Sequence, residues 1–172
     1  GDGMIYLDNA ATSFPKPKRV YDRMNQFLRE EAANPGRSGH RFSVAAEGQM
    51  VQARSVLAKF FGAENPERII FTLNCTDSLN IAIKGALHEG DHVITTILEH
   101  NSVLRPLNAL ETARKITVTK LKPSRNGFID PQDVKKAFQR NTRLVAITHA
   151  SNVIGVVQPI REIGRLVREQ NV

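Results

Sequence analysis

Short apolar runs alternate with polar turns and longer amphipathic segments along most of this chain. From residue 68 onward, the apolar runs are short and β-branched, as in buried strands, and the segments between them have helical periodicity. The strand-like runs are 69–72, 92–97, 116–121 and 144–148, and the helical segments are one after Thr76, then 102–113, 131–138 and one opened by Pro159. This alternation is typical of βα units. We therefore predict an α/β fold, a three-layer α/β/α sandwich with a largely parallel sheet.

The pattern before residue 68 differs from this alternation. Residues 5–7 predict a short strand, and an amphipathic helix is expected after Pro17. A Gly/Pro-rich loop at 34–40 ends that helix, and a long helix then runs to about Gly62. We expect residues 1–3 to be an expression scar, residues 4–66 to form a unit of strand, loop and helices, and residues 67–172 to form the sheet proper.

The stretch 68–80 combines a strand-like run, a short polar turn and the start of a helix. Such an arrangement makes an anion site, because the first turn of a helix has unpaired N–H groups and a positive dipole end. Thr76, with Ser78 as a weaker candidate, could add a hydroxyl to a phosphate cradle. The alternative is an ordinary N-cap, because Thr, Asp and Ser are common at any helix start.

Composition narrows the class of protein. The 172 residues are enough for one domain with a real core, and the net charge is +7. The basic residues are scattered along the chain, so we do not expect nucleic-acid binding. No apolar run is long enough to span a bilayer, and no metal-ligand spacing is found in the sequence. The single cysteine is typical of a reducing compartment, so we expect a cytoplasmic protein.

Polar clusters follow three of the predicted strands. They are Cys75 and Thr76, then Glu99 to Ser102, and His149 to Gly155. In open α/β sheets, ligands bind outside the carboxyl ends of the strands, so these clusters should converge on one crevice. A phosphate cradle, an imidazole and an amide together predict a site for a phosphorylated aromatic cofactor.

Five segments resemble one known family in order and spacing. They are Tyr6–Thr12, Asn34–His40, Phe71–Asn80, Leu98–Ser102 and Thr148–Gly155. The chain resembles the N-terminal half of the large domain of a cysteine desulfurase, in the class V aminotransferase family of fold type I pyridoxal-phosphate enzymes. The resemblance implies that residues 67–172 are the first part of a PLP-binding large domain.

The resemblance also implies a role for each site residue. Thr76, with the backbone N–H of Cys75, would bind the phosphate of pyridoxal 5'-phosphate. His100 would stack on the pyridine ring and relay protons, and Asn152 would hydrogen-bond the phenolic oxygen. The substrate side would be bordered by Asn9, Ala10 and His40. The alternatives are a helix cap for Thr76, a strand-end hydrogen bond for His100 and an Asx-turn for Asn152.

The chain departs from the family in two ways. Its phosphate turn reads Leu73 to Asp77 without the usual glycine, which restricts the backbone of the cradle. The resemblance places the Schiff-base lysine, the substrate-binding arginine and the sulfur-accepting cysteine beyond Val172, and covalent catalysis needs that lysine and thiolate. We therefore expect the isolated chain to be inactive, to form no specific lysine adduct with the cofactor, and to self-associate or be marginally stable.

The resemblance implies that the whole protein removes sulfur from L-cysteine as an enzyme persulfide and releases alanine. It also implies a homodimer and a sulfur-acceptor protein as partners. Three alternatives remain open at this point: a selenocysteine lyase, another class V aminotransferase, and a non-catalytic α/β phosphate-binding module.

Overall fold

The computed structural model describes residue 3, residues 5–36 and residues 39–172. These residues form two compact units, Gly1–Phe71 and Thr72–Val172. The change in sequence pattern predicted a domain boundary between residues 66 and 67, and that boundary stays a prediction.

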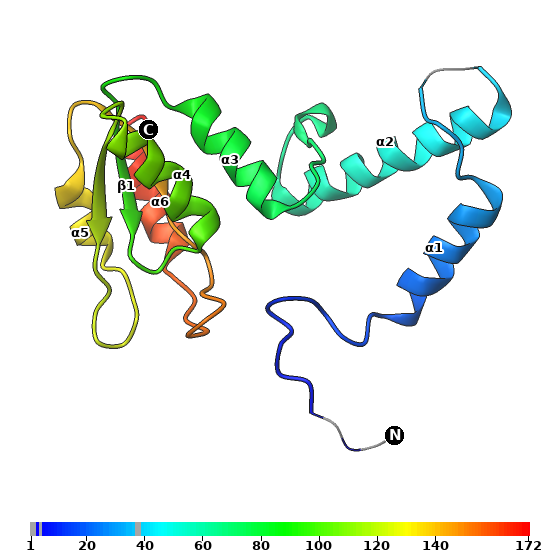
Figure 1. Ribbon diagram of the computed structural model, residues 1–172, viewed down its shortest axis with the longest axis horizontal. Helices are drawn as coiled ribbons and strands as arrows, with labels where there is room; N and C mark the ends of the chain where they lie inside the picture. Colours follow the sequence, from blue (N-terminus) through cyan, green and yellow to red (C-terminus); the bar gives the residue numbers. More distant parts are fainter. Residues whose placement is uncertain (1–2, 4, 37–38) are drawn as a thin grey trace. The chain divides into compact units, whose positions relative to one another are not determined.

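The elements alternate as the sequence predicts from residue 75 onward (Figure 1). They are, in chain order, α1 (Lys18–Glu30), α2 (Arg41–Phe61), the 3₁₀ turn η1 (Pro66–Arg68), α3 (Cys75–Ala86), β1 (His92–Thr96), α4 (Asn101–Thr112), β2 (Thr117–Leu121), α5 (Pro131–Ala137), β3 (Thr142–Ala146) and α6 (Ile160–Glu169).

The second unit is built on a parallel sheet of three strands in the order β2-β1-β3. The central strand β1 is buried along its whole length. One core, which contains Val93, Val103 and Leu107, packs α3 and α4 on one face of the sheet. A second core, which contains Val134 and Ile163, packs α5 and α6 on the other face. The three-layer α/β/α prediction is therefore confirmed for this unit.

One buried histidine forms hydrogen bonds across the start of the sheet. His92 of β1 is fully buried, and its Nδ1 and Nε2 lie 2.8 Å from the hydroxyls of Thr142 and Thr119. The ring therefore joins all three strands, because Thr119 belongs to β2 and Thr142 to β3. Burial lowers the pKa of His92, because desolvation disfavours the charged ring.

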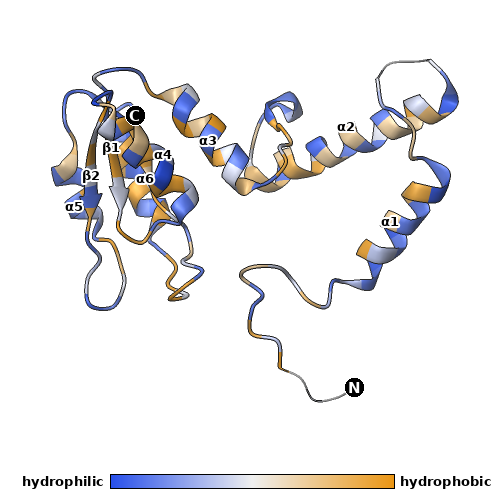
Figure 2. Ribbon diagram, viewed as in Figure 1, coloured by the Kyte–Doolittle hydropathy of each residue, from blue (hydrophilic) through white to orange (hydrophobic). Residues whose placement is uncertain are grey.

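The first unit is helical, and much of its apolar surface is exposed. No residue of α1 is buried, and α2 buries only Ser43, Ala46 and Ala58. Figure 2 shows hydrophobic and hydrophilic stretches alternating along both helices. Arg23 closes the last turn of α1 by a paired contact with Glu31, with both N–O distances at 3.0 Å. Gly62 ends α2 in the left-handed conformation (φ 69°), which a glycine adopts without steric cost.

Two predicted strands were wrong. Residues 5–7 and 69–72 pair with no other strand in the described part of the chain. Their composition suits a sheet, but a strand forms only where a neighbouring backbone completes the ladder. Ile70 is 77% exposed, so the apolar run at 69–72 is not a buried strand either.

No helix within the described residues is both long enough and apolar enough to cross a membrane.

Candidate functional site

Helix α3 begins at Cys75, before the predicted start after Thr76, and its cap is Asn74. The Asn74 side chain accepts a hydrogen bond of 2.9 Å from the N–H of Asp77. Thr76 therefore lies inside the first turn, and the N-cap alternative for it is wrong. Its hydroxyl forms no hydrogen bond with the described residues, and the N–H groups of Cys75 and Thr76 are also without partners there. Two N–H groups and a hydroxyl are thus available at the positive end of α3.

His100 is the N-cap of α4 and lies just beyond the end of β1. Its Nδ1 accepts a hydrogen bond of 3.1 Å from the N–H of Ser102 and lies 2.8 Å from the Ser102 hydroxyl. Because a backbone N–H can only donate, Nδ1 is the acceptor and the proton of the neutral ring is on Nε2. His100 is exposed, so core residues do not enclose its ring on both sides. The hydrogen bond to a neighbouring backbone group, which the structural alternative predicted, is also present.

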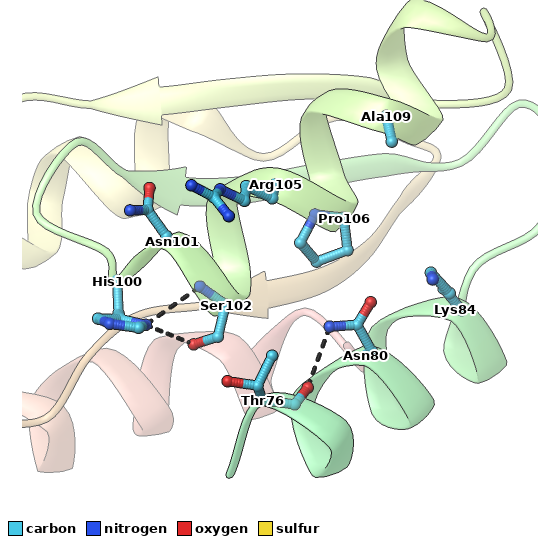
Figure 3. A pocket seen from close by; sticks show the side chains of 9 residues that line it. All are labelled: Thr76, Asn80, Lys84, His100, Asn101, Ser102, Arg105, Pro106 and Ala109. Carbon is cyan, nitrogen blue, oxygen red and sulfur yellow. Dashed lines mark hydrogen bonds between the residues drawn. The ribbon is translucent and has the colours of Figure 1, made fainter. Parts of the chain in front are cut away.

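Thr76 and His100 line the same cavity, which has a volume of about 400 Å³ (Figure 3). Figure 3 shows Thr76 and Asn80 on α3 lying opposite His100 and Ser102 at the start of α4. The cavity lies between these two helices, and Lys84 and Arg105 add positive charge to its lining. Its volume is in the range of ordinary small-ligand sites.

Asn152 is on a different segment and is not among the residues that line this cavity. It lies in an exposed turn after β3. The Asx-turn that was the structural alternative for Asn152 is absent from the described structure. Instead, the Ser151 hydroxyl accepts hydrogen bonds of 3.3 Å from the N–H groups of Val153 and Ile154. The predicted grouping of three residues around one cavity therefore holds for two of them, Thr76 and His100.

The loop that carries Asn152 is closed by backbone hydrogen bonds. Ser151 donates to the carbonyl of Val156 at 3.0 Å, and an antiparallel bridge joins Ala150 to Val157. Gln158 is 3% exposed and fixes the neighbouring loop, because it accepts from the N–H of Ile129 and donates to the carbonyl of Gly127, both at 2.9 Å. Nothing in the sequence around Gln158 marks it as buried, so it was not among the predicted site residues.

Glu99 is a buried carboxylate directly beside His100. It is 8% exposed, and its Oε1 accepts hydrogen bonds from the Thr96 hydroxyl at 2.8 Å and the Thr148 N–H at 2.9 Å. Burial raises the pKa of Glu99, and the two hydrogen bonds oppose part of that rise. The sequence analysis placed Glu99 in a polar cluster but gave it no role.

The three predicted substrate-side residues belong to the first unit. The Asn9 side chain stabilises a local turn, because Oδ1 accepts from the N–H of Phe14 and Nδ2 donates to the carbonyl of Tyr6, both at 3.3 Å. Ala10 is exposed in the same turn. His40 is the N-cap of α2, with Nδ1 accepting from Ser43 N–H at 3.2 Å. Residues 37–38 of the predicted 34–40 loop lie outside the described residues.

The parallel sheet, covered by helices on both faces, defines an α/β domain with polar segments at its strand ends. The family model for aminotransferase class-V matches residues 5–172. The chain therefore belongs to the aminotransferase class-V family, as the sequence motifs indicated.

Curated relatives are cysteine desulfurases. The chain is 41% identical over 172 residues to cysteine desulfurase IscS of Dictyoglomus turgidum, and the match covers 98% of this chain and 43% of that protein. It is 41% identical over 174 residues to cysteine desulfurase IscS of Klebsiella pneumoniae, with 98% and 42% covered. The chain thus spans less than half the length of these relatives.

Solved structures agree with this assignment. SspA in complex with cysteine superposes with a TM-score of 0.88 at 37% identity, over 97% of this chain and 48% of that one. The apo structure of a cysteine desulfurase from Thermococcus onnurineus NA1 also gives 0.88, at 33% identity over 98% of this chain and 42% of that one.

The family uses pyridoxal phosphate, and the residues at α3 fit the phosphate of that group. The N–H groups of Cys75 and Thr76 and the Thr76 hydroxyl are unused donors at a helix N-terminus, which is the usual chemistry of a phosphate site. The Asn74 cap is bonded to Asp77 and does not occupy them. Cys75 is exposed and is not among the residues that line the cavity, and its backbone N–H is the group that points to a phosphate site, because it lies in the first turn of α3.

Proposed function

We propose that the polypeptide carrying this chain is a pyridoxal-phosphate-dependent cysteine desulfurase, and that this chain supplies one wall of its active site. The observation that carries the proposal is that Thr76 and His100 line one cavity at the N-termini of adjacent helices. The desulfurase names of the relatives support the same reaction. In it, the sulfur of L-cysteine passes to an enzyme thiol as a persulfide, and alanine is released.

The start of α3 is proposed to hold the cofactor phosphate. The Thr76 hydroxyl and the N–H groups of Thr76 and Cys75 would donate to phosphate oxygens, and the helix dipole favours the negative charge. Lys84 and Arg105 line the same cavity and make it more positive. No backbone glycine is needed for these contacts, because the N–H groups are already free of partners within the described chain.

His100 is proposed to lie against the cofactor ring and to move protons during the reaction. When bound, the cofactor supplies an electron sink for bonds made and broken on the substrate. In the capped geometry the neutral His100 ring holds its proton on Nε2. Taking a second proton on Nδ1 would break the hydrogen bond from the Ser102 N–H, so proton relay requires the ring to leave its cap.

Asn152 is proposed to hydrogen-bond the phenolic oxygen of the cofactor. Its loop follows β3, and β3 runs parallel to β1, so the loop and His100 lie at the same edge of the sheet. Asn9, Ala10 and His40 are proposed to border the substrate, by resemblance alone. The Cys75 thiol is not proposed as the sulfur acceptor, because its position in the cradle is beside the phosphate.

The resemblance further supports a homodimer located in the cytoplasm, which delivers its sulfur to an acceptor protein. A reducing compartment suits a reaction that needs a free thiol.

The test is incubation of the polypeptide that carries this chain with L-cysteine, pyridoxal phosphate and a thiol reductant. The proposal predicts alanine and sulfide in equal amounts, and loss of both when the cofactor is removed. A class V transaminase would instead convert cysteine to a keto acid and require a keto-acid acceptor. A phosphate-binding module would give none of these products, and a selenocysteine lyase would release selenide from selenocysteine and little sulfide from cysteine.

A further inference from the structure

The carboxylate of Glu99 connects two segments with different proposed roles, the turn that carries His100 and the loop that carries Asn152. Glu99 directly precedes His100 at the end of β1, whereas Thr148 lies on the segment that runs from β3 to Asn152. The Glu99 Oε1 accepts the Thr148 N–H at 2.9 Å. The contact therefore joins the two strand ends at their carboxyl edge.

The direction of each hydrogen bond in this group is fixed by its donors. The Thr96 hydroxyl accepts from the N–H of Leu98 at 3.0 Å, so its single proton is free to be donated to Glu99 Oε1 at 2.8 Å. Thr96 is fully buried. Thr96 at the end of β1 and Thr148 after β3 therefore both donate hydrogen bonds to the same oxygen atom, Glu99 Oε1. Such a buried and satisfied network holds its members in a single geometry.

We propose that Glu99 is a positioning residue, whose Oε1 holds the turn that carries His100 and the loop that carries Asn152 in register with each other. The proposal rests on the proposed function for the roles of His100 and Asn152. Glu99 touches neither cofactor nor substrate in this account. The loop can respond as one body to the loss of this contact, because backbone bonds close it between Ser151 and Val156 and between His149 and Gln158.

Three variants separate the geometry of this contact from its charge. Glu99→Gln keeps an oxygen at the same distance along the side chain, so both hydrogen bonds can form without the charge. Glu99→Asp keeps the charge on a shorter side chain that cannot reach both donors, and Glu99→Ala removes the acceptor. The proposal predicts that Gln preserves the site and that Asp and Ala both disturb it.

The first measurement is made on the unloaded polypeptide that carries this chain. Amide chemical shifts of Thr148 and Asn152 should change in the Glu99→Asp and Glu99→Ala variants and stay close to the wild-type values in Glu99→Gln. Val134→Ala is the matched control, because Val134 is a fully buried residue of α5 and its truncation costs stability without touching this contact. Unchanged Asn152 shifts in Glu99→Ala would overturn the proposal.

The second measurement is the dissociation constant for pyridoxal phosphate. It should rise roughly tenfold in Glu99→Ala and Glu99→Asp, as expected if the displaced loop costs the cofactor one hydrogen bond from Asn152, and should stay within about twofold in Glu99→Gln and Val134→Ala. Wild-type affinity in Glu99→Ala would overturn the proposal. If the wild-type protein itself binds no pyridoxal phosphate, the proposed function fails, and the amide shifts alone then decide whether Glu99 couples the two segments.

Discussion

The Thr76 hydroxyl and the His100 ring line one cavity, although Thr76 belongs to α3 and His100 caps α4. The packing of α3 on α4 over a shared core brings them together. His100 follows β1 at the carboxyl edge of the sheet, whereas the segment before Thr76 is not part of the sheet in the described residues.

Thr76 and Asn74 should respond differently to mutation. Thr76→Val is expected to weaken pyridoxal-phosphate binding by roughly tenfold without loss of stability, since its hydroxyl forms no hydrogen bond with the described residues. Asn74→Ala is expected to lower the free energy of unfolding by about 1 kcal/mol, because it removes the cap of α3. Equilibrium dialysis and urea unfolding measure the two effects. Equal loss of stability in both variants would show that Thr76 is structural.

His100 has a capping role that can be kept while its chemistry is removed. Asn is a good N-cap residue, so His100→Asn should retain most of the stability, whereas His100→Ala should lose about 1 kcal/mol. Both should lower turnover by about 10²–10⁴-fold if the imidazole relays protons. Steady-state kinetics and thermal unfolding of the two variants provide the comparison. Wild-type turnover in His100→Asn would show that His100 only caps α4 and relays no protons.

The buried His92 ring predicts a pH dependence of stability. Burial lowers the folded-state pKa of His92 below its ordinary value of 6.5, so the unfolded chain binds more protons between the two pKa values. Stability should therefore be lost as pH falls from about 6.5 toward the folded pKa. His92→Gln should reduce this slope by at most one proton, about 1.4 kcal/mol per pH unit.

The control for that slope is Val134→Ala, which removes no titratable group and should keep the wild-type pH dependence while lowering stability throughout. Urea unfolding at several pH values between about 5 and 7.5 gives the slopes. An unchanged slope in His92→Gln would mean that another group sets the acid sensitivity.

Gly127 supports the Asn152 loop by leaving room for it. Its φ is +82°, and a Cβ there would lie 2.9 Å from Ile154 Cδ1 and 3.0 Å from Val156 Cγ2. Gly90 has a φ of +88° with nothing within 4 Å, so Gly90→Ala introduces the backbone strain without the contact. Gly127→Ala should therefore cost about 1 kcal/mol more than Gly90→Ala. Equal unfolding free energies for the two variants would rule out the close contact.

Much of the second unit could be predicted from the sequence, because its periodicity and its packing agree. Asp130 before Pro131 marked the start of α5, and the Asp130 side chain does accept from Gln132 N–H at 2.8 Å. The run at 69–72 has the same local composition as a true strand, but pairing depends on a partner that local sequence does not specify. Composition therefore failed to predict the structure of residues 69–72, because amino-acid types do not specify whether another strand pairs with a segment.

The site could be predicted only in part, for a similar reason. His100 lies beyond the carboxyl end of β1, as the βα alternation predicts. No strand of the described structure leads into Thr76, so its place beside His100 depends on the packing of α3 against α4. The choice of Asn74 over Thr76 as cap could not be predicted, since both are favourable capping residues. The burial of Glu99 and Gln158 depends on loops that close over them, and a polar residue in a polar cluster is usually exposed.

The measurement that tests the central claim most directly is the structure of the polypeptide that carries this chain with pyridoxal 5'-phosphate bound. The account predicts phosphate oxygens within about 3 Å of the Thr76 hydroxyl and the Cys75 N–H, with the cofactor ring against His100. A phosphate bound elsewhere, or a ring away from His100, would contradict the claim that this chain forms the cofactor wall.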